Sequence, residues 1–200
     1  MRVRTGLPVL LTVALLAAGC AAEKTELPGL TASPTSEAES SPTPTPTPDP
    51  VLEPSDPELG IVFEDVPELS DPDEIAVYNT VAAYQKEYWR MMTTNTVGLG
   101  FDVLASPEIE AMMQGIADQN AAAQATIAGV FHTRIGNITV SEDSATVTVC
   151  DDYRDVTATD PNGTYTAAEA GLENLAATLT LGPSGSGAWL ALRSSPAGAC

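Results

Sequence analysis

The spacing of apolar residues changes once along this chain of 200 residues, and that change constrains the fold more than any other feature. From residue 72 to about 128, apolar side chains recur every three or four positions, the repeat of a helix with one buried face. From Phe131 onward they alternate with polar residues, the repeat of a half-buried strand. Helices followed by a run of strands predict one α+β domain: two long helices packed on a curved antiparallel sheet.

Two long helices are predicted from their start signals. Residues 71–74 (Asp-Pro-Asp-Glu) supply a capping side chain, a first-turn proline and an acid at the third position, so a helix should run to about Thr93. Residues 106–108 (Ser-Pro-Glu) start a second helix in the same way, and Gly129 is expected to end it. The expected inner faces are Val77, Val81, Tyr84, Tyr88, Met91 and Met92 on the first helix, and Ile109, Met112, Met113, Ile116, Asn120, Ala123 and Ile127 on the second.

Four strands are predicted after the helices, with turn residues between them. The expected strands are residues 131–140, 145–153, 175–181 and 188–192, and the third could start as early as Gly171. Residues 157–170 are polar and alanine-rich and are left unassigned. A short tail after the last strand should bring Cys200 to the sheet.

The N-terminus reads as an export signal. Arg2 and Arg4 precede an uncharged apolar run that ends at Ala18, too short for a membrane-spanning helix, which needs about 20 apolar residues. The Ala-Gly-Cys that ends at Cys20 resembles a bacterial lipobox, whose thiol takes a diacylglycerol before cleavage. We therefore expect a signal peptide at residues 1–19 and a mature protein anchored by lipid at Cys20, on the extracytoplasmic face of the bacterial cell membrane.

An acidic tether is predicted between Cys20 and the domain. Fourteen of the eighteen residues from Ser33 to Pro50 are Ser, Thr or Pro, which cannot bury a core. Residues 20–70 are read as a disordered linker and 71–200 as the folded domain, although Ile61–Phe63 could lie on that domain. The chain has 27 Asp and Glu against 8 Lys and Arg, so it has no cationic surface for nucleic acid.

Three cysteines are present, and acylation of Cys20 would leave Cys150 and Cys200 as a pair. An exported, oxidising setting favours a disulfide between them. The alternative is two free buried thiols. A catalytic thiol is disfavoured because it needs an activating cation or base, whereas Asp151 and Asp152 follow Cys150.

This order of elements resembles small exported lipoproteins of GC-rich Gram-positive bacteria that have a nuclear-transport-factor-two-like fold. The matching features are Leu16 to Cys20, the proline-threonine tether, Gly129, Cys150-Asp151-Asp152, Trp189 and Cys200. The resemblance implies a cone-shaped domain with a cavity between the long helix and the sheet. It implies no reaction, because this fold hosts enzymes and binding modules alike.

The candidate cavity residues are Tyr84, Tyr88, Met91, Met112 and Asp151. Isomerases of this fold class use a cavity carboxylate with a tyrosine, but strand alternation allows only one of Asp151 and Asp152 to point inward. The tyrosines and methionines could also simply fill the core. The single histidine, His132, is read as structural, and no spacing indicates a metal, cofactor or catalytic site.

The sequence therefore predicts a non-catalytic, lipid-anchored envelope module that binds a protein partner or a small apolar ligand. Two alternatives are left open. One is an isomerase or hydrolase that works in the cavity, and the other is an accessory subunit of an envelope transport system.

Overall fold

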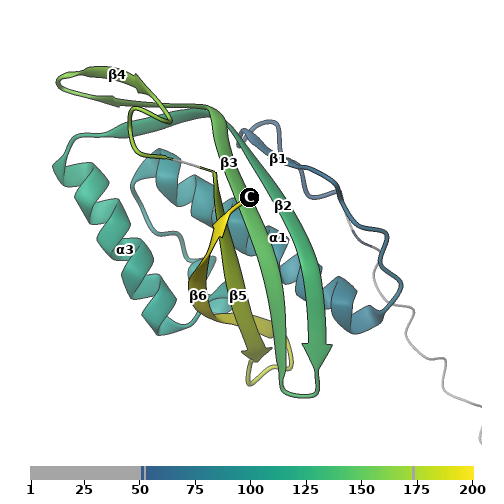
Figure 1. The fold of residues 1–200 in the computed structure, drawn as a ribbon. Helices are drawn as coiled ribbons and strands as arrows, with labels where there is room; N and C mark the ends of the chain where they lie inside the picture. The colour runs from purple at the N-terminus through teal and green to yellow at the C-terminus, as the bar shows by residue number, and fades with distance from the viewer. Residues whose placement is uncertain (1–50, 52, 173) are drawn as a thin grey trace, which may run out of the picture. The chain divides into compact units, whose positions relative to one another are not determined.

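The computed structural model describes residue 51, residues 53–172 and residues 174–200 (Figure 1). The expected signal peptide, the lipidation site at Cys20 and the tether up to residue 50 lie outside the described residues. Within the described part of the chain, none of the helices is long and apolar enough to cross a membrane.

The described chain is an α+β domain, as predicted. It consists of three helices and one sheet of six strands. In chain order the elements are β1 (Ile61–Phe63), α1 (Pro72–Thr94), α2 (Phe101–Leu104), α3 (Pro107–Ala122), β2 (Thr126–Ser141), β3 (Ser144–Asp160), β4 (Gly163–Thr166), β5 (Leu175–Pro183) and β6 (Trp189–Ala199). The strand order is β1-β2-β3-β5-β6, with β4 paired to the end of β3. The helices lie behind the sheet in Figure 1, with α1 behind β2 and β3 and α3 beside β6.

The prediction of a purely antiparallel sheet is wrong, because β1 pairs with β2 in parallel. The linker boundary at residue 70 is also too late, since Ile61 is fully buried and Phe63 is 5% exposed. The segment before α1 is held by Trp89, whose Nε1 donates to the carbonyl oxygen of Leu59 at 2.9 Å. A short apolar run inside an acidic, proline-rich stretch thus forms the edge strand of the sheet.

Helix α1 forms where the sequence predicts it. The Asp71 side chain accepts hydrogen bonds from the backbone N–H groups of Asp73 and Glu74 at 2.9 and 3.2 Å, so it caps the first turn. Asn95 ends the helix in the left-handed conformation, which asparagine tolerates, and its N–H donates to the Met91 carbonyl. The expected inner face is buried, apart from Tyr88, which is half-buried.

Helix α3 ends earlier than predicted, at Ala122 rather than at Gly129. Gln124 adopts the left-handed conformation, with φ of 52°. The N–H groups of Gln124 and Ala125 donate to the carbonyls of Ala121 and Asn120, the pair of bonds that closes a Schellman motif. This stop was not predicted because glutamine rather than glycine occupies the left-handed position.

Gly129 has a different role, inside β2. Its φ is +119°, and a Cβ atom placed there would lie 2.2 Å from the carbonyl oxygen of Asp155 in β3. Both the backbone conformation and the close approach of the two strands therefore require glycine at this position.

The strands are longer than the alternating pattern indicates. Strands β2 and β3 form a hairpin whose pairing runs from Ser141–Ser144 to Thr126–Thr159. Among residues 157–170, which the sequence pattern left unassigned, 157–160 complete β3 and 163–166 form β4. Strand β5 starts at Leu175, as expected, and not at the earlier alternative near Gly171. The expected C-terminal tail is part of β6, which pairs with β5 as far as Ala199.

Cys150 and Cys200 are joined as a disulfide, with Cα atoms 5.7 Å apart. Strand β5 lies between β3 and β6, and its first residue, Leu175, pairs with both Asp151 and Ala199. The disulfide therefore crosses the end of β5 and holds the end of β6 to β3. The C-terminus, at Cys200, is marked beside β3 in Figure 1.

We predict that Gly129→Ala destabilises the domain by about 2–3 kcal/mol, because it adds both backbone strain and a clash with the Asp155 carbonyl. Urea unfolding measures this change. Gly136→Ala is the matched control in the same strand: a Cβ there meets nothing within 4 Å, so a loss below about 1 kcal/mol is expected. Equal losses in the two variants would contradict the assigned role of Gly129.

Candidate functional site

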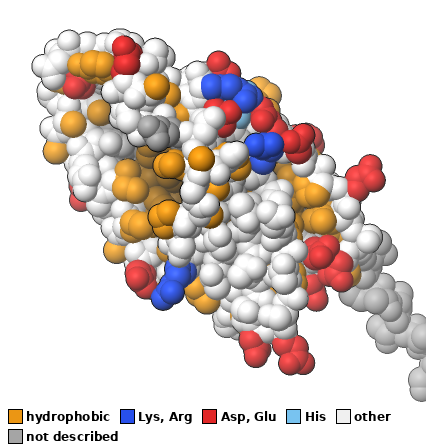
Figure 2. Space-filling model, in the orientation of Figure 1, with side chains coloured by type: hydrophobic (Ala, Val, Ile, Leu, Met, Phe, Trp, Pro, Cys, Tyr) orange, Lys and Arg blue, Asp and Glu red, His pale blue; other side chains and the backbone are white. Residues whose placement is uncertain are grey.

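A cavity of about 390 Å³ lies between α1, α3 and the sheet. We call it the tyrosine pocket. It is lined by Tyr84, Gln85, Tyr88, Met112, Met113, Val149, Asp151, Tyr153, Leu175, Ala176, Ala177, Leu179, Ser194, Pro196 and Gly198. Figure 2 shows hydrophobic side chains gathered in a hollow between α3 and the strands β5 and β6. Met112 and Leu175 are lining residues whose side chains are 45% and 52% exposed, so they form the open edge of the pocket, which we call its mouth.

Asp151 is the one acidic side chain among the described residues of the pocket lining, and a small polar network holds it. Its Oδ1 accepts hydrogen bonds from Gln85 Nε2 at 2.6 Å and from Thr133 Oγ1 at 3.1 Å. The second N–H of the Gln85 amide donates to Thr133 Oγ1 at 3.0 Å. Gln85 and Thr133 are the two polar side chains classed as buried among the described residues, and both bind the same carboxylate oxygen.

The other oxygen of Asp151, Oδ2, has no partner among the described residues. Oδ2 is also accessible to solvent. Among the described residues, the side-chain N and O atoms that are sealed from solvent and lack a hydrogen-bond partner are Asn95 Oδ1 and Asn120 Nδ2, so Oδ2 is not one of them. Asp151 lines the pocket, and Oδ2 is its carboxylate oxygen that none of the described residues occupies.

Burial raises the pKa of Asp151 to about 7, although the hydrogen bonds from Thr133 and Gln85 oppose the shift. The free-energy cost of desolvating the carboxylate exceeds the stabilisation that it gains from its two hydrogen-bond donors. The carboxyl group therefore changes protonation near neutral pH, which is an unusual property for an aspartate and one concentrated at functional sites.

Three tyrosines line the pocket together with this carboxyl group. The hydroxyls of Tyr88 and Tyr153 share a hydrogen bond of 2.7 Å. Because one hydroxyl donates to the other, the proton of the accepting hydroxyl has no acceptor within the pair. Tyr84 packs edge-on against Phe101, with ring centroids 5.7 Å apart. Burial raises the pKa of all three phenols, so they are neutral hydrogen-bond donors at physiological pH.

The structure brings together four of the five residues that the sequence singled out: Tyr84, Tyr88, Met112 and Asp151. Met91 does not join them, because it is fully buried in the core. Met112 was expected on the inner face of its helix but lies at the pocket mouth instead. Whether these residues bind a ligand stays a prediction.

Sequence reasoning did not single out Gln85, Thr133 or Tyr153. The first two carry a usable signal, since each is a polar residue at an inward position of an otherwise apolar repeat. Gln85 lies between Val81 and Trp89 on the buried face of α1, and Thr133 pairs directly across from Asp151.

His132 lies away from the pocket. It pairs across from Asp152 in β3, and its ring nitrogens lie 3.0 Å from Glu64 Oε1 and 2.9 Å from Asp155 Oδ2. Arg154 joins the same cluster through Glu64 and Asp152. This cluster ties β1 to β2 and β3, and within the described residues no group of His, Cys, Asp and Glu is arranged to hold a metal ion.

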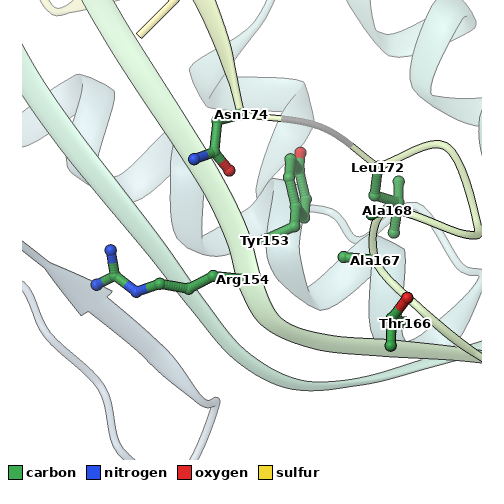
Figure 3. A pocket seen from close by; sticks show the side chains of 7 residues that line it. All are labelled: Tyr153, Arg154, Thr166, Ala167, Ala168, Leu172 and Asn174. Carbon is green, nitrogen blue, oxygen red and sulfur yellow. The ribbon is translucent and has the colours of Figure 1, made fainter.

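A second cavity, of about 470 Å³, borders the tyrosine pocket at Tyr153. Figure 3 shows Tyr153 and Arg154 leaving β3 in opposite directions, with Tyr153 toward Leu172 and Ala168 and Arg154 away from them. No carboxylate is among the described residues that line this second cavity, and the guanidinium of Arg154 is already paired with Glu64 and Asp152. The tyrosine pocket is therefore the stronger candidate site.

Comparisons with known proteins identify no family. No family model and no curated protein matches the chain. Among solved structures, the chain is similar to the intermembrane space region of the chloroplast protein ARC6, with a TM-score of 0.49 and 14% identity over 66% of this chain and 100% of that one. A de novo designed β-sheet protein gives a TM-score of 0.33 and 14% identity, over 60% and 91% of the two chains. Neither carries information about function, and the lipoprotein resemblance stays a prediction.

We predict that Asp151→Asn stabilises the protein at about pH 8. An unfolded aspartate loses its proton near pH 4, whereas the folded Asp151 keeps it up to about pH 7. Stability therefore falls as pH rises through that window and stays low above it. The amide keeps an acceptor for Gln85 and Thr133 but never ionises, so we expect a gain of about 1–3 kcal/mol at about pH 8 that disappears near pH 4.

Urea unfolding at the two pH values measures this difference. Asp152→Asn is the matched control, because its carboxylate lies on the opposite face and pairs with Arg154 at 2.6 Å. That variant should show no gain at about pH 8. A pH-independent effect of Asp151→Asn would contradict the raised pKa.

Proposed function

We propose that this chain is an exported, lipid-anchored module whose folded domain binds a small, largely apolar molecule in the tyrosine pocket. The observation that carries the proposal is the arrangement at Asp151. Burying polar groups costs free energy, and the two buried polar side chains described here are both used to hold one carboxyl group in an apolar cavity. A core could be filled more stably by apolar side chains.

The pocket suits a small ligand rather than a protein segment. Its volume of about 390 Å³ lies within the range of small-molecule sites, and its lining is mostly apolar with a few convergent polar atoms. The exposed side chains of Met112 and Leu175 at the mouth offer an apolar entrance. Met112 is flexible and polarisable, which suits irregular apolar surfaces.

The export and anchoring part of the proposal rests on the sequence before the domain. The apolar run followed by Ala-Gly-Cys supports lipidation at Cys20, and a pocket between α1 and the sheet agrees with the fold that the lipoprotein resemblance implies. The acidic tether would then let the domain meet its ligand outside the membrane.

We predict that filling the pocket abolishes binding of an uncharged apolar probe. Ala177 lines the pocket from β5, and Ala177→Phe would occupy it. The fluorescence of N-phenylnaphthylamine, which increases in apolar sites, measures binding, and we expect affinity to fall at least about tenfold, roughly 1.4 kcal/mol.

Ala123→Phe is the control, because Ala123 borders a different cavity at the end of α3. It should bind the probe as the parent protein does. Equal binding by all three proteins would place the probe elsewhere, and an absence of binding by the parent protein would contradict the proposed function.

A proton-transfer enzyme is the second candidate, because a carboxyl group that titrates near neutral pH beside neutral phenols suits general acid–base chemistry. Turnover of a β,γ-unsaturated ketone that is lost in Asp151→Asn, with the fold retained, would favour this enzyme over a binding module.

For the anchor, we predict that the protein expressed with its signal in a bacterium fractionates with membranes and that Cys20→Ala does not become acylated. Intact-mass analysis checks both. A mature N-terminus at another residue, without acyl groups, would contradict the anchor.

A further inference from the structure

The tyrosine pocket carries charge of only one sign. Asp151 is the sole acidic side chain among the described residues of its lining, and no Lys, Arg or His is among them. The residues that α3, β5 and β6 contribute are uncharged, and the other titratable groups, on α1 and β3, are the phenols of Tyr84, Tyr88 and Tyr153. Those phenols are neutral at physiological pH, because the ordinary pKa of tyrosine is about 10 and burial raises it further.

Aromatic rings beside a carboxylate form the environment that proteins use for organic cations. The face of a tyrosine ring attracts a cation, and an ammonium group donates charge-assisted hydrogen bonds to a carboxylate. Asp151 offers one such acceptor, because Oδ1 is occupied by Gln85 and Thr133 and Oδ2 is open. The formal charge of the whole chain, −19, also attracts cations.

We infer that the ligand of the tyrosine pocket is an apolar amine, bound as its ammonium ion with an N–H on Asp151 Oδ2 and its hydrocarbon part against Met112, Leu175 and Leu179. This inference rests on the proposed function and names the chemical class of the ligand. An anion finds no cation among the described lining residues and is repelled by ionised Asp151. A neutral alcohol donates one hydrogen bond but leaves a buried carboxylate without a counter-charge.

A cationic ligand also has a consequence for protonation. An ammonium group beside Asp151 favours the carboxylate, so binding lowers the pKa of Asp151 from its raised value and releases a proton near neutral pH. Amine affinity should therefore rise with pH until Asp151 is ionised. The affinity of a neutral ligand should not rise in this way.

Three probes that share one hydrocarbon part test the inference: phenethylamine, phenethyl alcohol and phenylacetate. Titration calorimetry of the full chain at about pH 8 measures their affinities. We expect the amine to bind at least about tenfold more tightly than the alcohol, and phenylacetate to bind most weakly. Asp151→Asn should abolish this roughly tenfold preference for the amine over the alcohol.

Asp152→Asn is the matched control, because it removes a carboxylate one position away on the opposite face of β3. It should leave the affinities of the three probes as they are. If Asp152→Asn lowers the affinity for the amine as much as Asp151→Asn does, the preference for the amine comes from the overall charge of the chain, and the inference is wrong.

A second measurement needs no variant. Near pH 7, amine binding in two buffers of different ionisation enthalpy should reveal release of a proton, whereas the alcohol should release none. Equal affinity for amine and alcohol, without proton release, would overturn the inference while the proposed binding function stands. Failure of the probes and of N-phenylnaphthylamine to bind would overturn both.

Discussion

The packing of α1 against β2 and β3 through Phe131 is the interaction on which the rest of the domain depends. The Phe131 ring stacks on Trp89 with centroids 5.0 Å apart and contacts Tyr88 and Tyr153 at 5.9 and 5.1 Å. Trp89 in turn holds the carbonyl of Leu59, so the same cluster fastens the segment that leads into β1. One buried phenylalanine thus joins the helix, two central strands and the edge strand.

The same packing positions the candidate site. Gln85 lies one helical turn before Trp89, and Asp151 lies two residues before Tyr153 on the same face of β3, so fixing the aromatic side chains also fixes Gln85 opposite Asp151. The disulfide between Cys150 and Cys200 holds the strand that carries Asp151 to the end of β6, which forms another wall of the pocket. Because burial makes ionised Asp151 costly, this carboxyl group lowers the stability of the domain as the pH rises through its raised pKa.

Local signals in the sequence were sufficient for much of this fold. The cap at Asp71, the start at Ser106 and the alternation after Phe131 predicted the α+β class and the inward direction of Asp151. The errors came from features that the pattern of residue types along the chain does not show. The end of α3 depends on a glutamine in a left-handed conformation, the role of Gly129 depends on close contact with Asp155, and β1 depends on a partner strand about 70 residues away. The network of Gln85 and Thr133 joins residues distant in sequence, so spacing along the chain could not reveal it.

The central claim is that Asp151 is held in an apolar pocket with one oxygen open, and the ionisation of that one carboxyl group tests it most directly. Carbon-13 NMR of the aspartate side-chain carboxyl signals, with the Asp151 signal assigned by its loss in Asp151→Asn, follows its titration. The structure predicts a midpoint near the raised pKa of about 7, and a shift of that midpoint to lower pH when phenethylamine is added. A midpoint near the ordinary aspartate value of about 4 would show a solvated carboxylate and contradict the account.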